Sequence, residues 1–335
     1  MGIKPHKDSK KGVNAMKRIG VLTSGGDAPG MNAAIRAVVR MGLAKGMEVY
    51  GIQKGYAGLL KGMVHEMNAR SVSDILHRGG TILQSSRCPE FREEAGVKKG
   101  VEIAKSMGLE GLVVIGGDGS FRGARDLSLA GLPTVGIPGT IDNDIGCTDT
   151  TIGFDTALNT VKDALDKIRD TAQSHERCSV IEVMGRGAGY IATYVAIACG
   201  AEAAIIPEKP YDFDKDIIKK IMDGKKRGKE NNLIVVAEGV GGSVEMAQKI
   251  EDITGIETRA TILGHIQRGG SPTVNDRMLA SRMGIHAVEL LYENKGNRVV
   301  AIKDKKIVDY DILEGLAMEK RMDNDIMDMA AILSL

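Results

Sequence analysis

The run Thr140-Ile141-Asp142-Asn143-Asp144 carries two carboxylates in a loop that directly follows a short apolar stretch. A carboxylate in such a loop is able to act as a general base, which accepts the proton of a hydroxyl group. Acids in loops also serve as turn residues or helix caps, so both interpretations stay open for Asp142 and Asp144 from this segment alone. If Asp142 or Asp144 is a general base, other segments of the chain must bind the groups that react.

Two glycine-rich turns have the composition of a phosphate-binding site. The strand-like run Arg18–Thr23 leads through residues 24–30 into a helix-like stretch, and residues 112–115 lead in the same way through residues 116–120. Backbone N–H groups and the positive end of a helix dipole suit phosphate oxygens at such turns. A turn that only caps a helix has the same composition. No GxxxxGK[ST] sequence is present, which excludes a Walker-type loop.

Asp118 lies inside the second glycine turn. A bare carboxylate there would repel a phosphate group unless a cation lies between them. Mg2+ is usually bound by one or two carboxylates together with phosphate oxygens. We therefore predict that Asp118 organises a Mg2+ ion.

Several arginines lie at predicted junctions between strands and loops. They are Arg87, Arg177, Arg186, Arg259 and Arg268. The rigid fork of a guanidinium suits bidentate binding of phosphate. Each arginine alone is typical of a solvated surface, but together they predict a ligand with phosphates at two ends.

The pattern of the elements predicts an α/β fold with two Rossmann-like three-layer domains and mainly parallel sheets. The chain has 335 residues with 43 glycines and 8 prolines, which is long enough for two cores. Apolar strands alternate with amphipathic helices, and ligand groups then gather at the carboxyl ends of the strands. The further predicted strands are residues 48–53, 134–137, 178–183, 203–206 and 233–237, and the predicted helices include residues 31–45 and 155–171.

Bulk properties exclude some classes of function. The formal net charge is +1, so nothing indicates a nucleic-acid or membrane surface. The four cysteines show no metal-binding spacing and predict free thiols in the cytoplasm. Residues 1–15 are polar and rich in lysine, and we expect them to form a disordered leader.

Eleven ordered motifs resemble the bacterial ATP-dependent 6-phosphofructokinase family, and the similarity extends from Lys17 to near the C-terminus. The motifs are SGGDAPGMNAAIR, LHRGGT, RCPEF, GGDGS, PGTIDND, IGFDTALNT, SHER, EVMGR, AEGV, ETR and GHIQRGGSP. The resemblance implies a glycolytic kinase that phosphorylates the 1-hydroxyl of fructose 6-phosphate with ATP and Mg2+. It implies an ATP-binding domain of residues 16–153 plus 267–316, and a sugar-phosphate domain of residues 154–266 plus 317–335.

The resemblance also assigns roles to individual residues. Asp142 would be the general base, Thr140 would hold the transferring phosphoryl group, and Arg87 and Arg186 would complete the catalytic set. The residues around ATP would be Gly26, Arg87, Cys88, Gly117, Asp118, Gly119 and Ser120, with Asp118 on the metal. Those around fructose 6-phosphate would be Thr140, Ile141, Asp142, Arg177, Met184, Gly185, Arg186, Glu238, Arg259, His265, Ile266, Gln267 and Arg268.

The family is a homotetramer in which Arg177 and Arg259 would enter the active site of a neighbouring subunit. It also binds ADP and phosphoenolpyruvate as effectors. The matching positions here are Arg36, Arg40, Asp74, Arg169, Gly200, Glu202, Arg227 and Lys229.

Two glycines favour ATP over pyrophosphate as the donor. Pyrophosphate-using relatives carry an aspartate at the position of Gly119 and a lysine at that of Gly139, where a side chain would meet the nucleotide. The sequence departs from the family at residues 145–147, where a proline is common, and at Gly187, where a histidine is common. A pyrophosphate-dependent enzyme and a catalytically silent, nucleotide-sensing subunit remain the alternatives.

Overall fold

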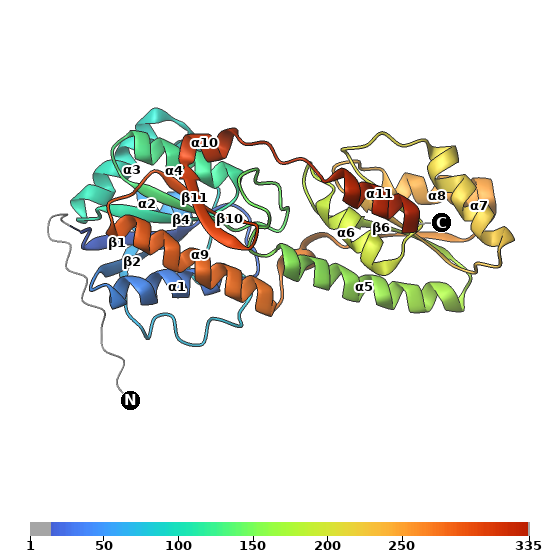
Figure 1. The fold of residues 1–335 in the computed structure, drawn as a ribbon, viewed down its shortest axis with the longest axis horizontal. Helices are drawn as coiled ribbons and strands as arrows, with labels where there is room; N and C mark the ends of the chain where they lie inside the picture. The colour runs from blue at the N-terminus through green and yellow to red at the C-terminus, as the bar shows by residue number, and fades with distance from the viewer. Residues whose placement is uncertain (1–14, 334–335) are drawn as a thin grey trace.

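The computed structural model describes residues 15–333, which form two α/β domains along one long axis (Figure 1). Each domain has a central sheet with helices on both faces, so the predicted fold class is confirmed. Residues 1–14 of the predicted leader lie outside the described residues. Met16 is buried in the core of the larger domain.

The larger domain contains a seven-stranded sheet. Its strands are β1 (Arg18–Thr23), β2 (Glu48–Ile52), β3 (Val64–Met67), β4 (Gly111–Gly116), β5 (Thr134–Pro138), β10 (Arg298–Lys303) and β11 (Lys306–Asp311). They lie in the order β11-β10-β5-β4-β1-β2-β3, and the edge strands β3 and β11 run antiparallel to their neighbours. Strand β4 is buried along its whole length, as expected for a central strand covered on both faces.

Helices cover both faces of this sheet (Figure 1). One face carries α1 (Met31–Ala44) and α9 (Val274–Tyr292), whose buried apolar side chains share one core with β1, β4 and β5. The opposite face carries α2 (Gly55–Leu60), η1 (Pro89–Arg92), α3 (Glu94–Ser106), α4 (Asp118–Leu129) and α10 (Ile312–Ala317). In α1 the buried residues Ile35, Val38 and Val39 recur at helical spacing, which gives the helix one apolar side.

The smaller domain contains a four-stranded parallel sheet. Its strands are β6 (Cys178–Val183), β7 (Ala203–Ile205), β8 (Asn232–Ala237) and β9 (Thr258–Ile262), in the order β7-β8-β6-β9. One face carries α5 (Phe154–Ser174) and α6 (Tyr190–Cys199), and the other carries η2 (Asp214–Ile218), α7 (Lys219–Lys226) and α8 (Ser243–Thr254). The short helix η3 (Gly264–Arg268) follows β9, and α11 (Asn324–Leu333) packs against α6.

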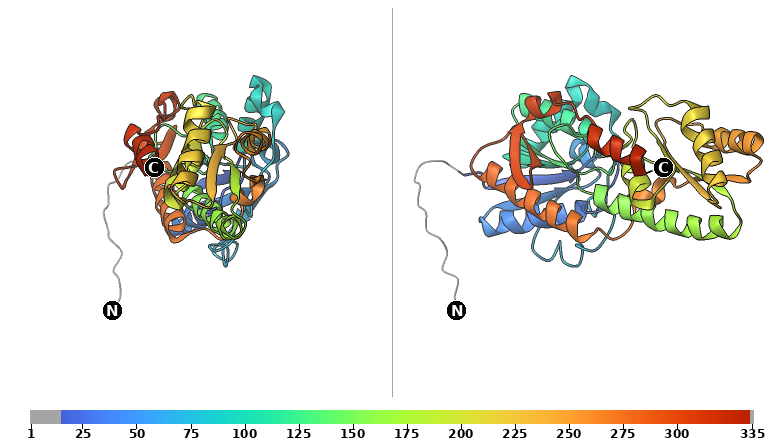
Figure 2. Two further views of the ribbon diagram at one scale, coloured as in Figure 1. Left: turned by 90° about the vertical axis from the view of Figure 1, so that its right-hand side faces the viewer. Right: turned by 45° about the vertical axis from the view of Figure 1, so that its right-hand side comes forward.

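The chain passes between the domains at three places: into α5, from η3 to α9, and from α10 to α11 (Figures 1 and 2). The first passage leads into α5 at Phe154, and the third follows the end of α10 at Ala317. The exact domain limits stay predictions.

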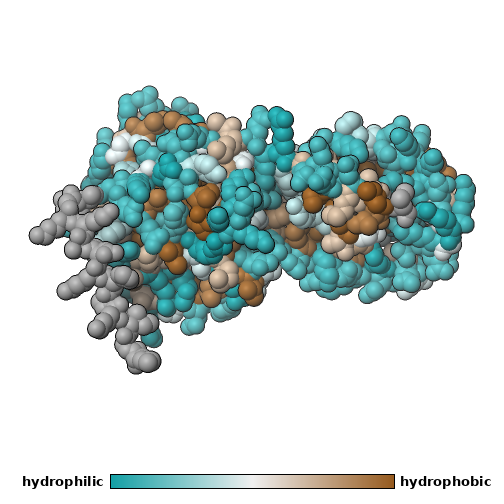
Figure 3. All heavy atoms as spheres, in the orientation of Figure 1, coloured by the Kyte–Doolittle hydropathy of each residue, from teal (hydrophilic) through white to brown (hydrophobic). Residues whose placement is uncertain are grey.

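The surface is mostly hydrophilic (Figure 3). Helix α11 exposes Met329, Ile332 and Leu333, and apolar side chains gather on that face of the smaller domain. Within residues 15–333, none of the helices combines the length and apolar character that a membrane span requires.

Candidate active site

The two glycine turns and the loop of Asp142 follow the adjacent strands β1, β4 and β5. Because these strands are parallel, the three segments meet at one edge of the large sheet. The N–H of Ser24 donates to the carbonyl of Ile115 at 2.9 Å, and the N–H of Gly139 donates to the carbonyl of Gly116 at 2.9 Å. The candidate phosphate loops and the candidate base therefore lie side by side, as the sequence predicted.

The glycines of the second turn permit a close approach of backbone segments. A Cβ atom at Gly116 would lie 2.4 Å from the carbonyl oxygen of Ser24 and 2.4 Å from the Ser120 hydroxyl. At Gly119, a Cβ atom would meet no atom of the described residues within 4 Å. Gly117 directly precedes α4, and the first N–H groups of a helix have no partner within the helix, so this helix start suits a phosphate group.

Arg87 and Cys88 lie in a loop that an aromatic stack fixes beside the second glycine turn. Phe91 stacks on Tyr56 with ring centroids 4.2 Å apart. The Tyr56 hydroxyl donates a hydrogen bond to the carbonyl of Ser120 at 2.5 Å. Arg87 itself is exposed, so its guanidinium is free to reach a ligand at this edge.

The loop of Asp142 is held by hydrogen bonds within the large domain. The Thr151 hydroxyl donates to the carbonyl of Thr140 at 2.7 Å, and the N–H of Thr151 donates to Oδ1 of Asn143 at 3.1 Å. The N–H of Asp142 donates to the Thr140 hydroxyl at 3.2 Å. Asn143 has a φ of 54°, a left-handed conformation that asparagine tolerates better than most residues.

Asp142 has the environment of a general base. Its side chain is buried, and its Oδ1 atom has no hydrogen-bond partner among residues 15–333. Burial first, and then the charge of Asp144, raise the pKa of Asp142 above its ordinary value, whereas the Arg268 and Arg186 guanidinium groups oppose this shift. A buried, unpaired carboxylate oxygen with a raised pKa is suited to take a proton from a hydroxyl group.

Asp118 fits the predicted Mg2+ ion. It begins α4, its carboxylate is 41% exposed, and it pairs with Arg122 at 2.9 Å. It also lies close enough to Asp144 to contribute to the raised pKa of that residue, of which burial is the main cause. The described residues contain no cluster of three acidic, histidine or cysteine side chains that would hold a metal by itself. A single accessible carboxylate matches Mg2+ bound mainly through phosphate oxygens and water.

The sugar-side residues gather at the carboxyl ends of the small sheet. Oε1 of Glu238 accepts hydrogen bonds from the N–H groups of Gly185 at 3.1 Å and Arg186 at 2.7 Å. The N–H of Met184 donates to Oε1 of Gln267 at 3.1 Å, and Gln267 is fully buried. These bonds hold the loop after β6, in which Arg186 has a φ of 60°.

Arg268 joins the sugar side to the first glycine turn. Its Nη1 donates to the carbonyl of Asp27 at 3.2 Å, and a Cβ atom at Gly26 would lie 2.2 Å from the same nitrogen. His265 and Ile266 of the same short helix are exposed. A side chain at position 26 would therefore displace the guanidinium of Arg268 from its present place on this turn.

Arg177 and Arg259 lie at the opposite edge of the small sheet. They adjoin the amino ends of β6 and β9, whereas Arg186 follows the carboxyl end of β6. The length of β6, at about 3.3 Å per residue, separates the two edges by roughly 17 Å or more. Both arginines pair with Glu257, Arg177 at 2.7 Å. Within one chain the structure does not bring them to Asp142.

The predicted effector residues form two separate groups in the chain. Arg36, Arg40 and Asp74 belong to the large domain, whereas Arg169, Gly200, Glu202, Arg227 and Lys229 belong to the small one. In the second group Arg169 donates to the carbonyl of Cys199, and Lys229 pairs with the buried Glu202. Helices α1 and α7 lie at opposite ends of the molecule (Figure 1).

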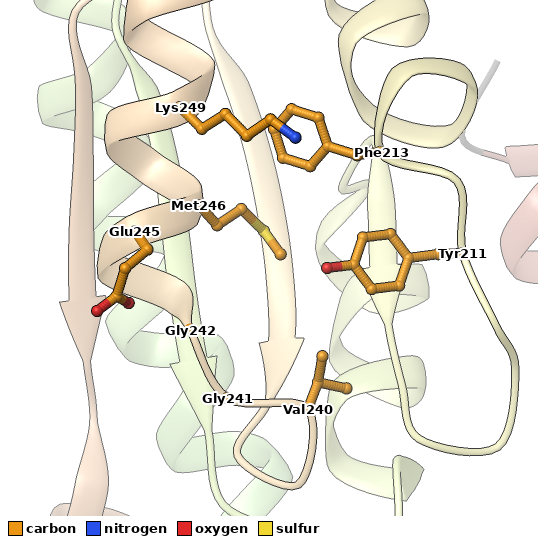
Figure 4. A pocket seen from close by; sticks show the side chains of 8 residues that line it. All are labelled: Tyr211, Phe213, Val240, Gly241, Gly242, Glu245, Met246 and Lys249. Carbon is orange, nitrogen blue, oxygen red and sulfur yellow. The ribbon is translucent and has the colours of Figure 1, made fainter.

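An open pocket of about 500 Å³ lies elsewhere, at the carboxyl end of β8 (Figure 4). Its walls include Tyr211, Phe213, Val240, Gly241, Gly242, Glu245, Met246 and Lys249. The ammonium group of Lys249 lies 3.9 Å from the ring centroid of Phe213. None of the predicted site residues lines this pocket, so we do not assign the chemistry to it.

The structure adds two residues that the sequence did not predict. Lys320 contacts the loop of Asp142 from the C-terminal segment, and Asp276 of α9 accepts hydrogen bonds from the start of α5. Neither lies in a motif with a recognisable spacing, because both act across more than a hundred residues of sequence.

Comparison with known proteins identifies the family of the chain. Residues 18–291 match the family model described as Phosphofructokinase. The chain is 62% identical over 319 residues to the ATP-dependent 6-phosphofructokinase of Clostridium botulinum. The matched region covers 95% of this chain and all of the relative. The corresponding protein of Clostridium novyi is 60% identical over the same length.

Solved structures are similar over most of the chain. A phosphofructokinase from Saccharomyces cerevisiae gives a TM-score of 0.85 at 35% identity, covering 95% of this chain and 48% of the yeast chain. A pyrophosphate-dependent phosphofructokinase from Marinobacter aquaeolei gives 0.83 at 21% identity, with 95% and 91% coverage, which supports the fold alone. On the strength of the family match and the extended identity, the chain belongs to the phosphofructokinase family.

Proposed function

We propose that the chain transfers the γ-phosphoryl group of ATP to the 1-hydroxyl of fructose 6-phosphate. The observation that carries this proposal is the position of Asp142, whose buried and unpaired carboxylate oxygen lies beside both phosphate turns and the two guanidinium groups of Arg186 and Arg268. The ATP-dependent 6-phosphofructokinases of Clostridium to which the chain is similar support the same reaction.

In this proposal Asp142 accepts the proton of the attacking 1-hydroxyl. Thr140, whose carbonyl and hydroxyl are both fixed by hydrogen bonds, is positioned to contact the transferring phosphoryl group. Arg87 of the large domain and Arg186 of the small domain neutralise charge that develops during transfer. Phosphoryl transfer depends mainly on such alignment and charge neutralisation.

The nucleotide lies on the two glycine turns. The N–H groups at the start of α4 and the open space at Gly119 receive its phosphates, with Gly26, Cys88 and Ser120 around them. Asp118 would hold the Mg2+ ion, which would supply positive charge that offsets the negative charge of the phosphate groups.

The sugar phosphate is bound by Met184, Gly185, Arg186 and Glu238 around the hydroxyls, with Ile141 beside them. His265, Ile266 and Arg268 line the 6-phosphate side, and the buried Gln267 holds the loop of Met184 beside them. Arg177 and Arg259 complete this phosphate site in a neighbouring subunit, because they lie at the far edge of the small sheet. The proposal therefore requires an oligomer, and we propose a homotetramer.

We propose ADP and phosphoenolpyruvate as effectors that bind between subunits. The separation of the effector residues into a large-domain group and a small-domain group supports a site shared by two chains. The four free cysteines support the cytoplasm as the location of the enzyme.

ATP is the proposed donor because the space at Gly119 is open to a larger ligand. Gly139 is a weaker argument than the sequence indicated, since a Cβ atom there would already lie 3.1 Å from Ile115. A catalytically silent, nucleotide-sensing chain would be free to lose its catalytic residues. This chain retains Asp118, Asp142 and Arg186, which disfavours that alternative.

A coupled assay of fructose 1,6-bisphosphate formation tests the function. The native chain is expected to use ATP, and Asp142→Asn is expected to lower kcat by about 10²- to 10⁴-fold. If the native chain is inactive with ATP but active with pyrophosphate, the proposed donor is wrong and pyrophosphate is the donor. Inactivity with both donors would support the silent subunit.

A further inference from the structure

Residues 318–323 cross from α10 of the large domain to α11 of the small domain (Figures 1 and 2). Both sides of this crossing are anchored in a core. Ile312 of α10 is buried in the large domain, and Met322 is buried in the small domain, where its sulfur accepts a hydrogen bond from Thr193 at 3.4 Å. The crossing segment is therefore fixed to both domains at once.

The backbone of the crossing segment lies directly on the loop that follows Asp142. A Cβ atom at Gly146 would lie 1.9 Å from the carbonyl oxygen of Met318, so only a glycine permits this contact. Residues 139–153 contain no proline, and no pyrrolidine ring restricts the loop backbone. The shape of the loop depends on contacts of this kind.

Lys320 provides the second contact, and it is polar. Its ammonium group donates to Oδ1 of Asn143 at 2.8 Å and to the carbonyl of Asp149 at 3.1 Å. The same group lies 5.2 Å from the ring centroid of Tyr190, the first residue of α6 in the small domain. One side chain thus contacts the residue next to Asp142 and the domain that carries Arg186.

We propose that Lys320 is a positioning residue, which holds Asn143 and thereby orients the carboxylate of Asp142 toward the sugar side of the site. This inference rests on the proposed function. The amide oxygen of Asn143 accepts both the Lys320 ammonium and the N–H of Thr151, so Lys320 and Thr151 together fix the side chain of Asn143 and with it the loop backbone beside Asp142. A displacement of the base by about 1 Å is enough to lower the rate by about 100-fold.

Several charged or titratable groups surround Lys320. Asp149, Asp144, Lys303, Cys147 and Tyr190 face it from the loop, from β10 and from α6. The pKa of Lys320 is lowered to about 8, mainly because the ammonium group is buried and secondly because the positive charge of Lys303 repels it. Its hydrogen bond to Asn143 therefore loses the assistance of a charge in weakly alkaline solution.

Steady-state kinetics of full-length Lys320→Met, Lys320→Arg and Arg321→Ala test the proposal. Lys320→Met removes the donors but keeps an unbranched side chain, and we expect kcat to fall by about 10- to 100-fold with KM values changed by less than about threefold. Lys320→Arg is expected to retain most of kcat. Arg321 is the matched control, because it is the exposed neighbour that pairs with Glu319, and its removal should leave kcat unchanged.

The pH profile separates positioning from a merely structural role. In the native chain kcat is expected to decline as pH rises through about 8, the pKa of Lys320, and Lys320→Arg should move this decline to higher pH. An unchanged kcat in Lys320→Met, or an identical alkaline decline in Lys320→Arg, would overturn this inference while leaving the proposed function intact. A native chain that does not phosphorylate fructose 6-phosphate would overturn both.

Discussion

Asp276 at the start of α9 accepts two hydrogen bonds from Thr156 at the start of α5, one from its N–H at 2.8 Å and one from its hydroxyl at 2.5 Å. The same carboxylate accepts the N–H of Gly153 at 2.8 Å. A large-domain side chain therefore caps the long helix that enters the small domain, in place of a cap from α5 itself.

Replacement of this cap is expected to reduce stability. Asp276→Ala leaves buried N–H groups without an acceptor, so we expect the free energy of unfolding to fall by about 2–4 kcal/mol, and Asp276→Asn to give an intermediate loss. Urea denaturation followed by circular dichroism measures this. Asp163→Ala, on the exposed side of α5, is the control and should change stability by less than about 0.5 kcal/mol. An equal effect of both substitutions would contradict the capping role.

The pH dependence of kcat is expected to report the environment of Asp142. Only the ionised carboxylate accepts a proton, so activity declines as pH falls through its pKa, which burial and Asp144 raise above the ordinary carboxylate value. Asp144→Asn removes the repelling charge, lowers that pKa and should shift the acid limb to lower pH. Asp325→Asn on the exposed end of α11 should leave the limb in place. A shift of the limb to higher pH in Asp144→Asn would disprove this reading.

A side chain at Gly119 is expected to obstruct ATP without affecting the fold. No described atom lies within 4 Å of a Cβ at this position, so Gly119→Asp should leave the midpoint of thermal unfolding nearly unchanged while sharply lowering kcat/KM for ATP. Gly119→Ala, which adds only a methyl group, should lower it less. Unchanged ATP kinetics in Gly119→Asp would remove the argument for ATP that rests on this glycine.

Two inactive chains are expected to complement each other if active sites are shared. Arg186 and Arg259 lie at opposite edges of the small sheet, so Arg186→Ala and Arg259→Ala damage different subunits of one site. Subunit exchange at equal amounts should restore roughly a quarter of the native sites.

The control mixture combines Arg186→Ala with Asp142→Asn. Asp142 and Arg186 act in the same chain, where the charge of Arg186 influences the pKa of Asp142, so every site keeps at least one defect and no activity should return. Recovery in the control, or none in the test mixture, would argue against shared sites.

The sequence by itself determined the fold class, most of the central strands and the loops at their carboxyl ends, but it did not predict the interior strand β10. Strands such as β4 are buried throughout and therefore consist of continuous apolar runs, which are recognisable without a structure. The edge strands β3, β9 and β11 are partly exposed, and their mixed composition gave no such signal. The roles predicted for Asp118 and Asp142 came from the loops that carry them together with the family resemblance, and these roles stay predictions.

Only the tertiary structure decided which distant residues meet. It placed Lys320 on Asn143, 177 residues away in sequence, and Asp276 on Gly153, 123 residues away. It also separated Arg177 from Arg186, although they are close in sequence, because β6 runs the full height of the sheet between them. Spacing along a chain encodes contacts within one element, whereas contacts between elements depend on strand order and on the paths by which the chain crosses between domains.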